Sequence, residues 1–305
     1  MPFRFQPPLE VIASMDSWQA QNFDRQACGP IDRVICLRFP TYYSQHPRKV
    51  VWLIHQHRSV YELFNTQYGE KETTPNALRL REEVVRRDTE SLAAARVFAN
   101  SRRVAERLLQ YNGLISTPLY HPPPNADRYF EGDQFPYIFA PSRLESLKRH
   151  ELVLRAMAHV EDPIMLLIGG EGGTRRHLEG VVEQLGLRHR VKFLGHLGPI
   201  DMIPLYANCL GIFFGPYDED LGYITLEAML SSKPVITCSD SGGPLEFITH
   251  GENGLVVAPM QEEIAAAINR LGRDRAFARA LGSAGREKYT GLGISWDRVV
   301  DTLLE

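Results

Sequence analysis

Residues 209–259 read CLGIFFGPYDEDLGYITLEAMLSSKPVITCSDSGGPLEFITHGENGLVVAP, and this stretch decides the fold. An apolar run at 210–214 leads into an acidic loop, a helix is expected over 223–231, and a second apolar run occupies 234–238. Strand, helix and strand in this order build a parallel sheet. Such sheets bind ligands at the carboxyl ends of their strands, where loops meet helix N-termini. The stretch therefore predicts an α/β domain with a ligand site at one edge of its sheet.

Two carboxylates in this stretch are candidate site residues. Glu227 lies on the expected helix, which is apolar around most of its circumference, so its carboxylate is expected to be buried and to need a polar partner. Glu219 lies eight residues earlier, in the loop that leads into the helix. Together they suit a polyhydroxyl ligand whose anionic part meets the helix dipole. The alternative for each is a solvated surface glutamate, which the apolar helix disfavours for Glu227.

The segment from Glu219 to Glu227 matches the E-x7-E motif of the family 4 retaining glycosyltransferases, which belong to the glycosyl transferases group 1. SGGPLEFITHGENGLVV, residues 241–257, resembles the segment that follows the motif in that family. The resemblance implies an α/β protein with the GT-B fold, in which two Rossmann-like domains face a cleft. It also implies a retaining hexosyltransferase that moves a hexose from a nucleoside-diphosphate sugar to a glycan or lipid-linked acceptor. Bacterial surface-polysaccharide biosynthesis is the family's commonest setting.

The resemblance also assigns roles to residues of the motif. Glu219 would hold hydroxyls of the donor sugar and Glu227 those of the ribose, so both would position the donor rather than transfer protons. The start of the helix would aim main-chain N–H groups at the donor. The residues at this start are Gly222, Tyr223, Ile224 and Thr225.

A second motif follows the expected strand FPYIFA at 135–140. Arg143 and Lys148 come after this strand in the pattern R-L-x-x-x-K, just before an expected helix. An arginine can grip phosphate oxygens with two hydrogen bonds, and a lysine adds a point charge. The pair matches the family's diphosphate-binding residues in type, spacing and position. The resemblance therefore implies that they stabilise charge on the leaving phosphates, with no metal and no further cofactor required.

The Gly-rich loop at 169–173 lies on the nucleotide side by the same resemblance. A dinucleotide fingerprint is excluded, because Arg175 or Arg176 stands where its last glycine should be. After the next expected strand, the resemblance places main-chain groups of His196 and Leu197 beside the nucleobase. The alternative for His196 is a structural histidine.

In the first half, the apolar run KVVWLI at 49–54 predicts a strand that ends at His55-Gln56-His57. Two histidines could suggest a metal ligand pair, but the sequence has no further ligand cluster to support a metal site. Family members carry a histidine or an acid near the donor sugar at the end of such a strand, and by this comparison His55 is selected over His57. Residues 9–13 are expected to form one short strand.

Residues 1–30 contain no glycine pair after an apolar run, whereas the family's N-terminal domain begins with a strand and a Gly-rich loop. We therefore expect a shortened N-terminal domain at 1–134, a nucleotide-sugar-binding domain at 135–290, and a helix at 291–305 that crosses back to the first domain. A partner chain that supplies the missing strand is one explanation. The second candidate function is accordingly a non-catalytic glycosyltransferase-like subunit that binds a nucleotide sugar or complements a partner chain.

Composition limits the remaining possibilities. The 305 residues suffice for two domains, and the net charge of −3 disfavours nucleic acid as a partner. The scattered cysteines Cys28, Cys36, Cys209 and Cys238 form neither a metal motif nor a disulfide framework, which indicates a reducing cytoplasm. Arginines concentrated at 79–107 predict either a solvated helix face or a basic face for an anionic acceptor or a lipid surface. Any membrane contact is expected to be peripheral, at the inner face.

Overall fold

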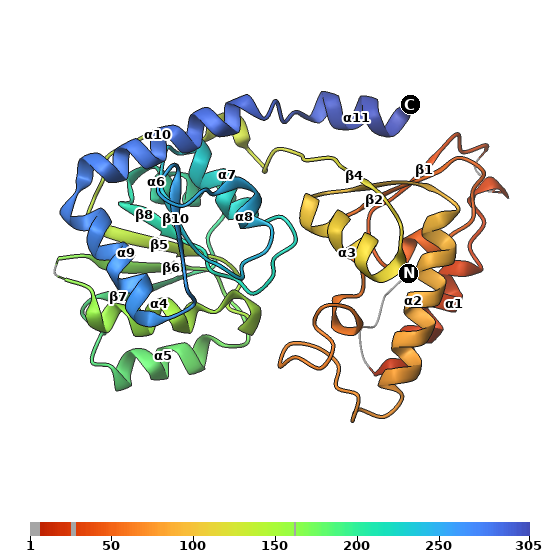
Figure 1. Ribbon diagram of the computed structural model, residues 1–305, viewed down its shortest axis with the longest axis horizontal. Helices are drawn as coiled ribbons and strands as arrows, with labels where there is room; N and C mark the ends of the chain where they lie inside the picture. Colours follow the sequence, from red (N-terminus) through yellow and green to blue (C-terminus); the bar gives the residue numbers. More distant parts are fainter. Residues whose placement is uncertain (1–6, 26–28, 162) are drawn as a thin grey trace. The chain divides into compact units, whose positions relative to one another are not determined.

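The computed structural model describes residues 7–25, 29–161 and 163–305, so Cys28 lies outside the described residues. The chain forms two compact units (Figure 1). Residues up to 121 together with 296–305 make unit 1, and residues 122–295 make unit 2. No helix among the described residues is both long enough and apolar enough to span a membrane.

Unit 1 contains a parallel sheet of four strands in the order β1-β2-β3-β4. Its strands are β1 (Val34–Cys36), β2 (Lys49–Leu53), β3 (Arg96–Ala99) and β4 (Thr117–Pro118). Its helices are α1 (Pro8–Gln19), α2 (Ala77–Ala93), α3 (Arg102–Asn112) and α11 (Trp296–Leu304). Side chains alternate along a strand, so each strand of this sheet presents residues to both faces, and helices pack on both of them. Val51 and Leu53 of β2 pack with α1, α2 and α3, whereas Val50 and Trp52 pack with Val299 of α11.

The described N-terminal segment is helical, so the strand expected at residues 9–13 is wrong. Pro8 stands at the first position of α1, where its missing N–H costs nothing. Val11 and Met15 lie one turn apart and are both completely buried. The apolar residues of this stretch therefore follow the helical period, which a window of five residues is too short to distinguish from that of a strand.

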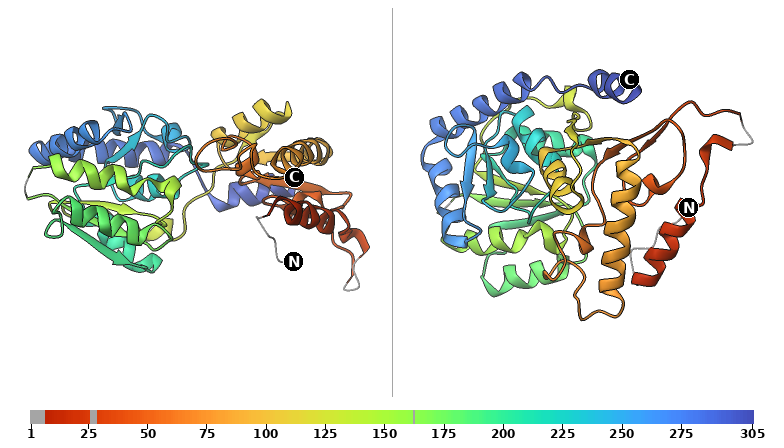
Figure 2. Two further views of the ribbon diagram at one scale, coloured as in Figure 1. Left: turned by 90° about the horizontal axis from the view of Figure 1, so that it is seen from below. Right: turned by 45° about the vertical axis from the view of Figure 1, so that its right-hand side comes forward.

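Unit 2 contains a parallel sheet of six strands in the order β10-β9-β8-β5-β6-β7, and helices cover both of its faces (Figure 1 and Figure 2). Its strands are β5 (Tyr137–Pro141), β6 (Met165–Gly169), β7 (Val191–Gly195), β8 (Gly211–Phe213), β9 (Val235–Cys238) and β10 (Gly254–Val257). Its helices are α4 (His150–Ala156), α5 (Arg175–Gln184), α6 (Pro199–Asn208), α7 (Tyr223–Leu230), α8 (Pro244–Phe247), α9 (Gln261–Arg273) and α10 (Arg275–Gly291). The order is that of a Rossmann sheet. The chain builds outward from β5 to β7 and then returns to β8, so β5 and β8 are neighbours where the order reverses.

Residues 122–134, which the sequence analysis groups with the N-terminal domain, belong to unit 2. The main-chain N–H of Gly132 donates to the carbonyl of Ala207 at 3.1 Å. The buried ammonium of Lys233 donates to the carbonyl of Asp133 at 2.6 Å. These bonds fasten the segment alongside α6 and the start of β9.

We predict that Leu303→Ala lowers the free energy of unfolding of unit 1 by about 2–5 kcal/mol, as expected for truncation of a buried leucine. Leu303 is 5% exposed and anchors α11 to the sheet, whereas its neighbour Leu304 is 56% exposed. All three tryptophans, Trp18, Trp52 and Trp296, lie in unit 1, so urea unfolding followed by tryptophan fluorescence reports on this unit. Leu304→Ala is the control and should change the value by less than about 0.5 kcal/mol. Equal effects of the two substitutions would contradict the docking of α11 through its buried face.

Candidate functional site

Lys148 and Glu219 meet at the point where the strand order of unit 2 reverses. Lys148 ends the short 3-10 helix Ser146–Lys148 in the loop after β5, and Glu219 lies in the loop after β8. The ammonium nitrogen of Lys148 lies 2.5 Å from Oε2 of Glu219. The two side chains are 13% and 17% exposed. The two motifs identified in the sequence are thus in direct contact through one ion pair.

Main-chain hydrogen bonds fix the loop that carries Glu219. The N–H of Tyr217 donates to the carbonyl of Leu147 at 2.8 Å, which ties the loop to the segment bearing Lys148. The N–H of Glu219 donates to the carbonyl of Ser241 at 2.8 Å, which ties it to the loop after β9. Both ends of the ion pair are therefore held by backbone geometry as well as by charge.

Arg149 reinforces the same junction, and the sequence analysis missed it. Its guanidinium donates to the carbonyls of Gly215 and Pro216, each at 2.8 Å, and makes two hydrogen bonds to the carboxylate of Asp240. Its backbone has φ +52°, a left-handed conformation that is strained for a residue with a side chain. Four hydrogen bonds offset this strain. In the sequence, the only indication of a role for Arg149 is its position beside Lys148, because its hydrogen-bond partners lie far along the chain.

Arg143 is exposed at the carboxyl end of β5. Among the described residues, no hydrogen bond or ion pair joins its side chain to Lys148, Glu219 or Glu227. Its neighbour Ser142 packs against the Gly-rich loop, where a Cβ on Gly170 would lie 2.0 Å from the carbonyl oxygen of Ser142. Arg143 therefore lies just past the end of this strand, as the sequence predicts.

Glu227 lies on α7 and is 7% exposed. Its Oε2 accepts a hydrogen bond of 2.5 Å from the hydroxyl of Tyr206 on α6. Burial raises the pKa of Glu227, and the hydroxyls of Tyr206 and Tyr129 partly counteract this rise. The expected burial and polar partnership of this carboxylate are both present, but its partners are tyrosines that the sequence analysis did not identify.

The first turn of α7 begins at a position that requires glycine. Gly222 has φ +83°, and a Cβ there would lie 2.9 Å from the ring of Phe214. Tyr223 is exposed and Ile224 is half-buried. The N–H of Thr225 already donates to the carbonyl of Gly222 at 3.0 Å, so it is engaged within the helix. Tyr223 and Ile224 belong to the same first turn of α7, where main-chain N–H groups point out of the helix N-terminus.

His196 and Leu197 follow β7, as the sequence predicts. His196 is exposed, and a methyl group of Leu197 would lie 3.0 Å from a Cβ on Gly169. The N–H of Gly170 donates to the carbonyl of Gly195 at 2.8 Å. The loop after β7 and the Gly-rich loop after β6 therefore lie side by side.

His55 belongs to unit 1, where it follows β2. It is half-buried, and its Nδ1 lies 2.8 Å from the carbonyl oxygen of Gln56. His57 is buried and stacks on Phe39, and burial lowers its pKa to about 4. A buried, neutral His57 is a structural residue, which leaves His55 as the more accessible histidine of the pair.

No cluster of three or more His, Cys, Asp or Glu side chains suited to a metal ion occurs in the part of the chain that the structure describes.

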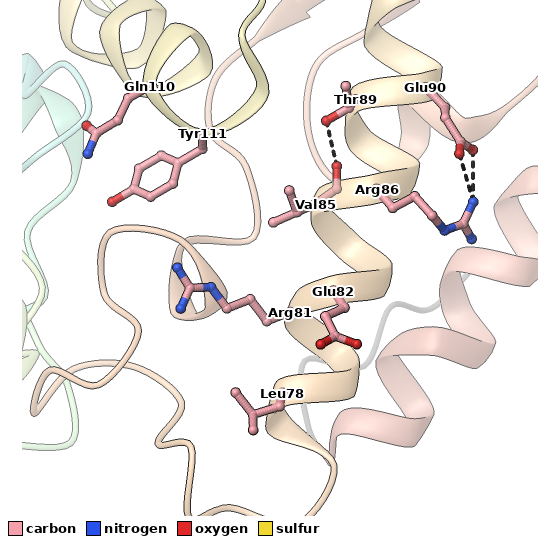
Figure 3. A pocket seen from close by; sticks show the side chains of 9 residues that line it. All are labelled: Leu78, Arg81, Glu82, Val85, Arg86, Thr89, Glu90, Gln110 and Tyr111. Carbon is pink, nitrogen blue, oxygen red and sulfur yellow. Dashed lines mark hydrogen bonds and ion pairs between the residues drawn. The ribbon is translucent and has the colours of Figure 1, made fainter.

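A groove of about 870 Å³ lies between α2 and α3 in unit 1 (Figure 3). It is lined by Leu78, Arg81, Glu82, Val85, Arg86, Thr89, Glu90, Gln110 and Tyr111. Arg86 is paired with Glu90 at 2.9 Å, and Arg87 on the same helix is paired with Asp16 of α1 at 2.5 Å. These arginines have acidic partners at the surface, which favours the solvated helix face over the basic docking face.

The family described as Glycosyl transferases group 1 matches residues 125–288, more than half of the chain. The chain belongs to this family. It is 33% identical over 164 residues to an uncharacterized glycosyltransferase of Methanocaldococcus jannaschii, covering 52% of this chain and 40% of that protein. It is 28% identical over 237 residues to the D-inositol 3-phosphate glycosyltransferase of Nocardia farcinica, covering 70% and 52%. The chain thus spans about half the length, or less, of these curated relatives.

Solved structures of low sequence identity share the fold. HepE of Anabaena, solved in complex with UDP and glucose, superposes with a TM-score of 0.71 at 19% identity, over 99% of this chain and 84% of that one. Sucrose-phosphate synthase from Thermosynechococcus elongatus gives a TM-score of 0.80 at 20% identity, over 100% and 79%. The GT-B fold, an α/β architecture with two parallel Rossmann-like sheets, is confirmed.

We predict that Arg149→Gly loosens the loop after β8 without adding backbone strain, because glycine tolerates the left-handed conformation. The loss of hydrogen bonds from a charged donor should lower the free energy of unfolding of unit 2 by about 1–3 kcal/mol. Amide hydrogen exchange at residues 215–219 should become faster. The control is Arg155→Ala, which removes a surface pair with Glu151 and should change stability by less than about 1 kcal/mol. Unchanged exchange at 215–219 in Arg149→Gly would show that the arginine does not hold this loop.

Proposed function

We propose that this protein transfers a hexose from a nucleoside-diphosphate sugar to a glycan or lipid-linked acceptor with retention of the anomeric configuration. The setting we propose is bacterial surface-polysaccharide biosynthesis. The observation that carries the proposal is the contact of Lys148 with Glu219 at the reversal point of a Rossmann sheet. Open α/β sheets bind their ligands at this point, beyond the carboxyl ends of the strands.

The charges of the pair suit the two ends of such a donor. Departure of a nucleoside diphosphate builds negative charge on the phosphates, which Lys148 can stabilise at short range. When a diphosphate takes over Lys148, the carboxylate of Glu219 is released to accept hydrogen bonds from sugar hydroxyls. In this proposal Arg143 supplies the second cation from the same strand end, by reorientation of its exposed side chain.

The other predicted residues take supporting roles in the proposal. Glu227 accepts hydrogen bonds from the ribose hydroxyls, and main-chain groups of His196 and Leu197 contact the nucleobase. The N-terminus of α7 meets the anionic part of the donor through the N–H groups of Tyr223 and Ile224. His55 of unit 1 is assigned to the donor sugar by family resemblance alone. No metal ion is required, because the cationic side chains balance the phosphate charge.

The two acids do not act as the acid and base of a hydrolase in this proposal. Glu219 is paired with a cation, and Glu227 is held by phenol hydroxyls inside unit 2. Neither arrangement leaves a carboxyl group poised to protonate a leaving group. Both acids therefore position the donor, and the rate enhancement comes from orientation and charge stabilisation.

The names of the relatives support sugar transfer from an activated donor. One is a D-inositol 3-phosphate glycosyltransferase, and another is a GDP-mannose-dependent phosphatidylinositol monomannoside mannosyltransferase of Mycobacterium tuberculosis, 29% identical over 208 residues. The latter alignment covers 63% of this chain and 53% of that protein. We test the donor class first, by thermal stabilisation of the purified protein with a panel of nucleoside diphosphates and nucleotide sugars.

We predict that Lys148→Ala lowers kcat for sugar transfer about 10²-fold or more, because a charge-stabilising donor is lost from the transition state. The assay uses the nucleotide sugar that stabilises the protein best, at a saturating concentration, and measures the release of nucleoside diphosphate. Lys148→Arg should retain part of the activity, since the charge remains. Lys192→Ala, which removes an exposed lysine of β7, is the control and should leave kcat unchanged.

A wild-type rate in Lys148→Ala contradicts the catalytic assignment. Binding of nucleotide sugars by the wild-type protein, with no turnover for any acceptor, would instead fit the nucleotide-sugar-binding subunit considered in the sequence analysis.

A further inference from the structure

The carboxylate of Glu227 is surrounded by phenol hydroxyls from distant parts of unit 2. Tyr206 on α6 has no exposed surface, and its hydroxyl donates to Oε2 of Glu227 at 2.5 Å. Tyr129, from the segment before β5, packs edge-on against Tyr206 with ring centroids 5.7 Å apart. Its hydroxyl also acts on Glu227, and it lowers the pKa of that carboxylate.

This arrangement costs stability rather than supplying it. A buried carboxylate loses its hydration, and phenol hydroxyls compensate only part of that loss. Burial accordingly raises the pKa of Glu227. A phenylalanine at position 206 would keep the edge-on packing against Tyr129 and Phe139, so packing alone does not explain the hydroxyl. The hydrogen bond and the acid are therefore best explained together, by a ligand.

The remaining hydrogen-bonding capacity of Glu227 suits a diol. A carboxylate offers about four acceptor positions, and two phenol hydroxyls use at most two of them. Glu227 keeps 7% of its surface exposed, so part of the residue is still accessible from outside. Tyr206 is carried by α6, which begins directly after the loop of His196 and Leu197. One helix thus connects the loop proposed for the nucleobase to the acid proposed for the ribose.

We infer that Tyr206 is a positioning residue that orients the carboxylate of Glu227 toward the 2′- and 3′-hydroxyls of a ribonucleoside diphosphate. The hydroxyl of Tyr206 fixes one carboxylate oxygen, and the acceptor positions that the phenols do not use are available to the ligand. The protein consequently selects ribonucleotide over 2′-deoxyribonucleotide donors. This inference rests on the proposed function, and what it adds is Tyr206, a residue outside the E-x7-E motif.

The test compares dissociation constants for UDP, GDP and their 2′-deoxy counterparts, measured by calorimetry. The wild-type protein should bind the ribonucleotide that it prefers about 10-fold more tightly than the 2′-deoxy form, the effect of one hydrogen bond to a charged group. Tyr206→Phe should weaken ribonucleotide binding about 10-fold more than 2′-deoxy binding, because the 2′-deoxy form has only its 3′-hydroxyl contact to lose, so that the preference disappears. A merely structural defect would weaken both forms alike.

A matched control and a second variant complete the design. Tyr137→Phe removes a hydroxyl that bonds the carbonyl of Leu205 on α6 at 2.9 Å, one residue before Tyr206, and it should keep the wild-type preference. Glu227→Asp shortens the acid and withdraws it from the Tyr206 hydroxyl, so it should lose the preference even if Tyr206→Phe fails to fold.

The outcomes separate the two proposals. If nucleoside diphosphates bind and Tyr206→Phe or Glu227→Asp keeps the ribose preference, the positioning role is overturned while the proposed function stands. If the wild-type protein binds UDP and GDP no more tightly than their 2′-deoxy counterparts, the positioning role is again overturned. If no nucleoside diphosphate binds the wild-type protein, the proposed function and this inference both fail.

Discussion

The adjacency of β5 and β8 is the constraint on which the candidate site depends. Lys148 and Glu219 are 71 residues apart in sequence, and they meet because the loops that follow neighbouring parallel strands emerge at the same edge of the sheet. Both side chains are largely buried, and a buried charge is stable only with a partner of opposite sign. Each residue therefore holds the other at the strand ends. The position where a doubly wound sheet binds its ligand is thus also a position where this chain buries a pair of opposite charges.

Backbone features around this contact keep the loops in place. Gly242 has φ +71°, and a Cβ there would lie 2.6 Å from the carbonyl oxygen of Glu219, so the turn after β9 can approach the acid only as glycine. Arg149, next to Lys148, adopts a left-handed conformation and bonds Gly215 and Pro216 of the loop after β8 and Asp240 of the loop after β9. Strain of this kind persists only where the surroundings compensate it. Its concentration around Glu219 indicates that the geometry of this loop matters more than its local stability.

The sequence was sufficient for the parts of the structure that depend on local pattern. Apolar runs bounded by glycine and proline predicted β2, β5, β8 and β9, and the apolar helix with one acid predicted α7 and the burial of Glu227. The motifs also placed Lys148 and Glu219 in loops that follow strands, where the structure has them. Arg149 and Tyr206 were missed, because their roles come from partners on other loops and helices that no local pattern encodes.

The two acids of the motif differ in the type of partner, and this difference accounts for their proposed roles. Glu219 faces the cation Lys148, which a phosphate of the donor can bind in place of Glu219, so the environment of Glu219 changes when a donor arrives. Glu227 faces Tyr206, which is neutral and fully buried, so its environment stays fixed while a ligand binds. A carboxylate that changes partner suits the reacting end of a donor, where groups move as the bond breaks. A carboxylate held by phenol hydroxyls suits the ribose, which does not react and whose binding positions the donor in the site. The spacing of the motif thus separates a responsive acid in the loop before α7 from a fixed acid on α7 itself.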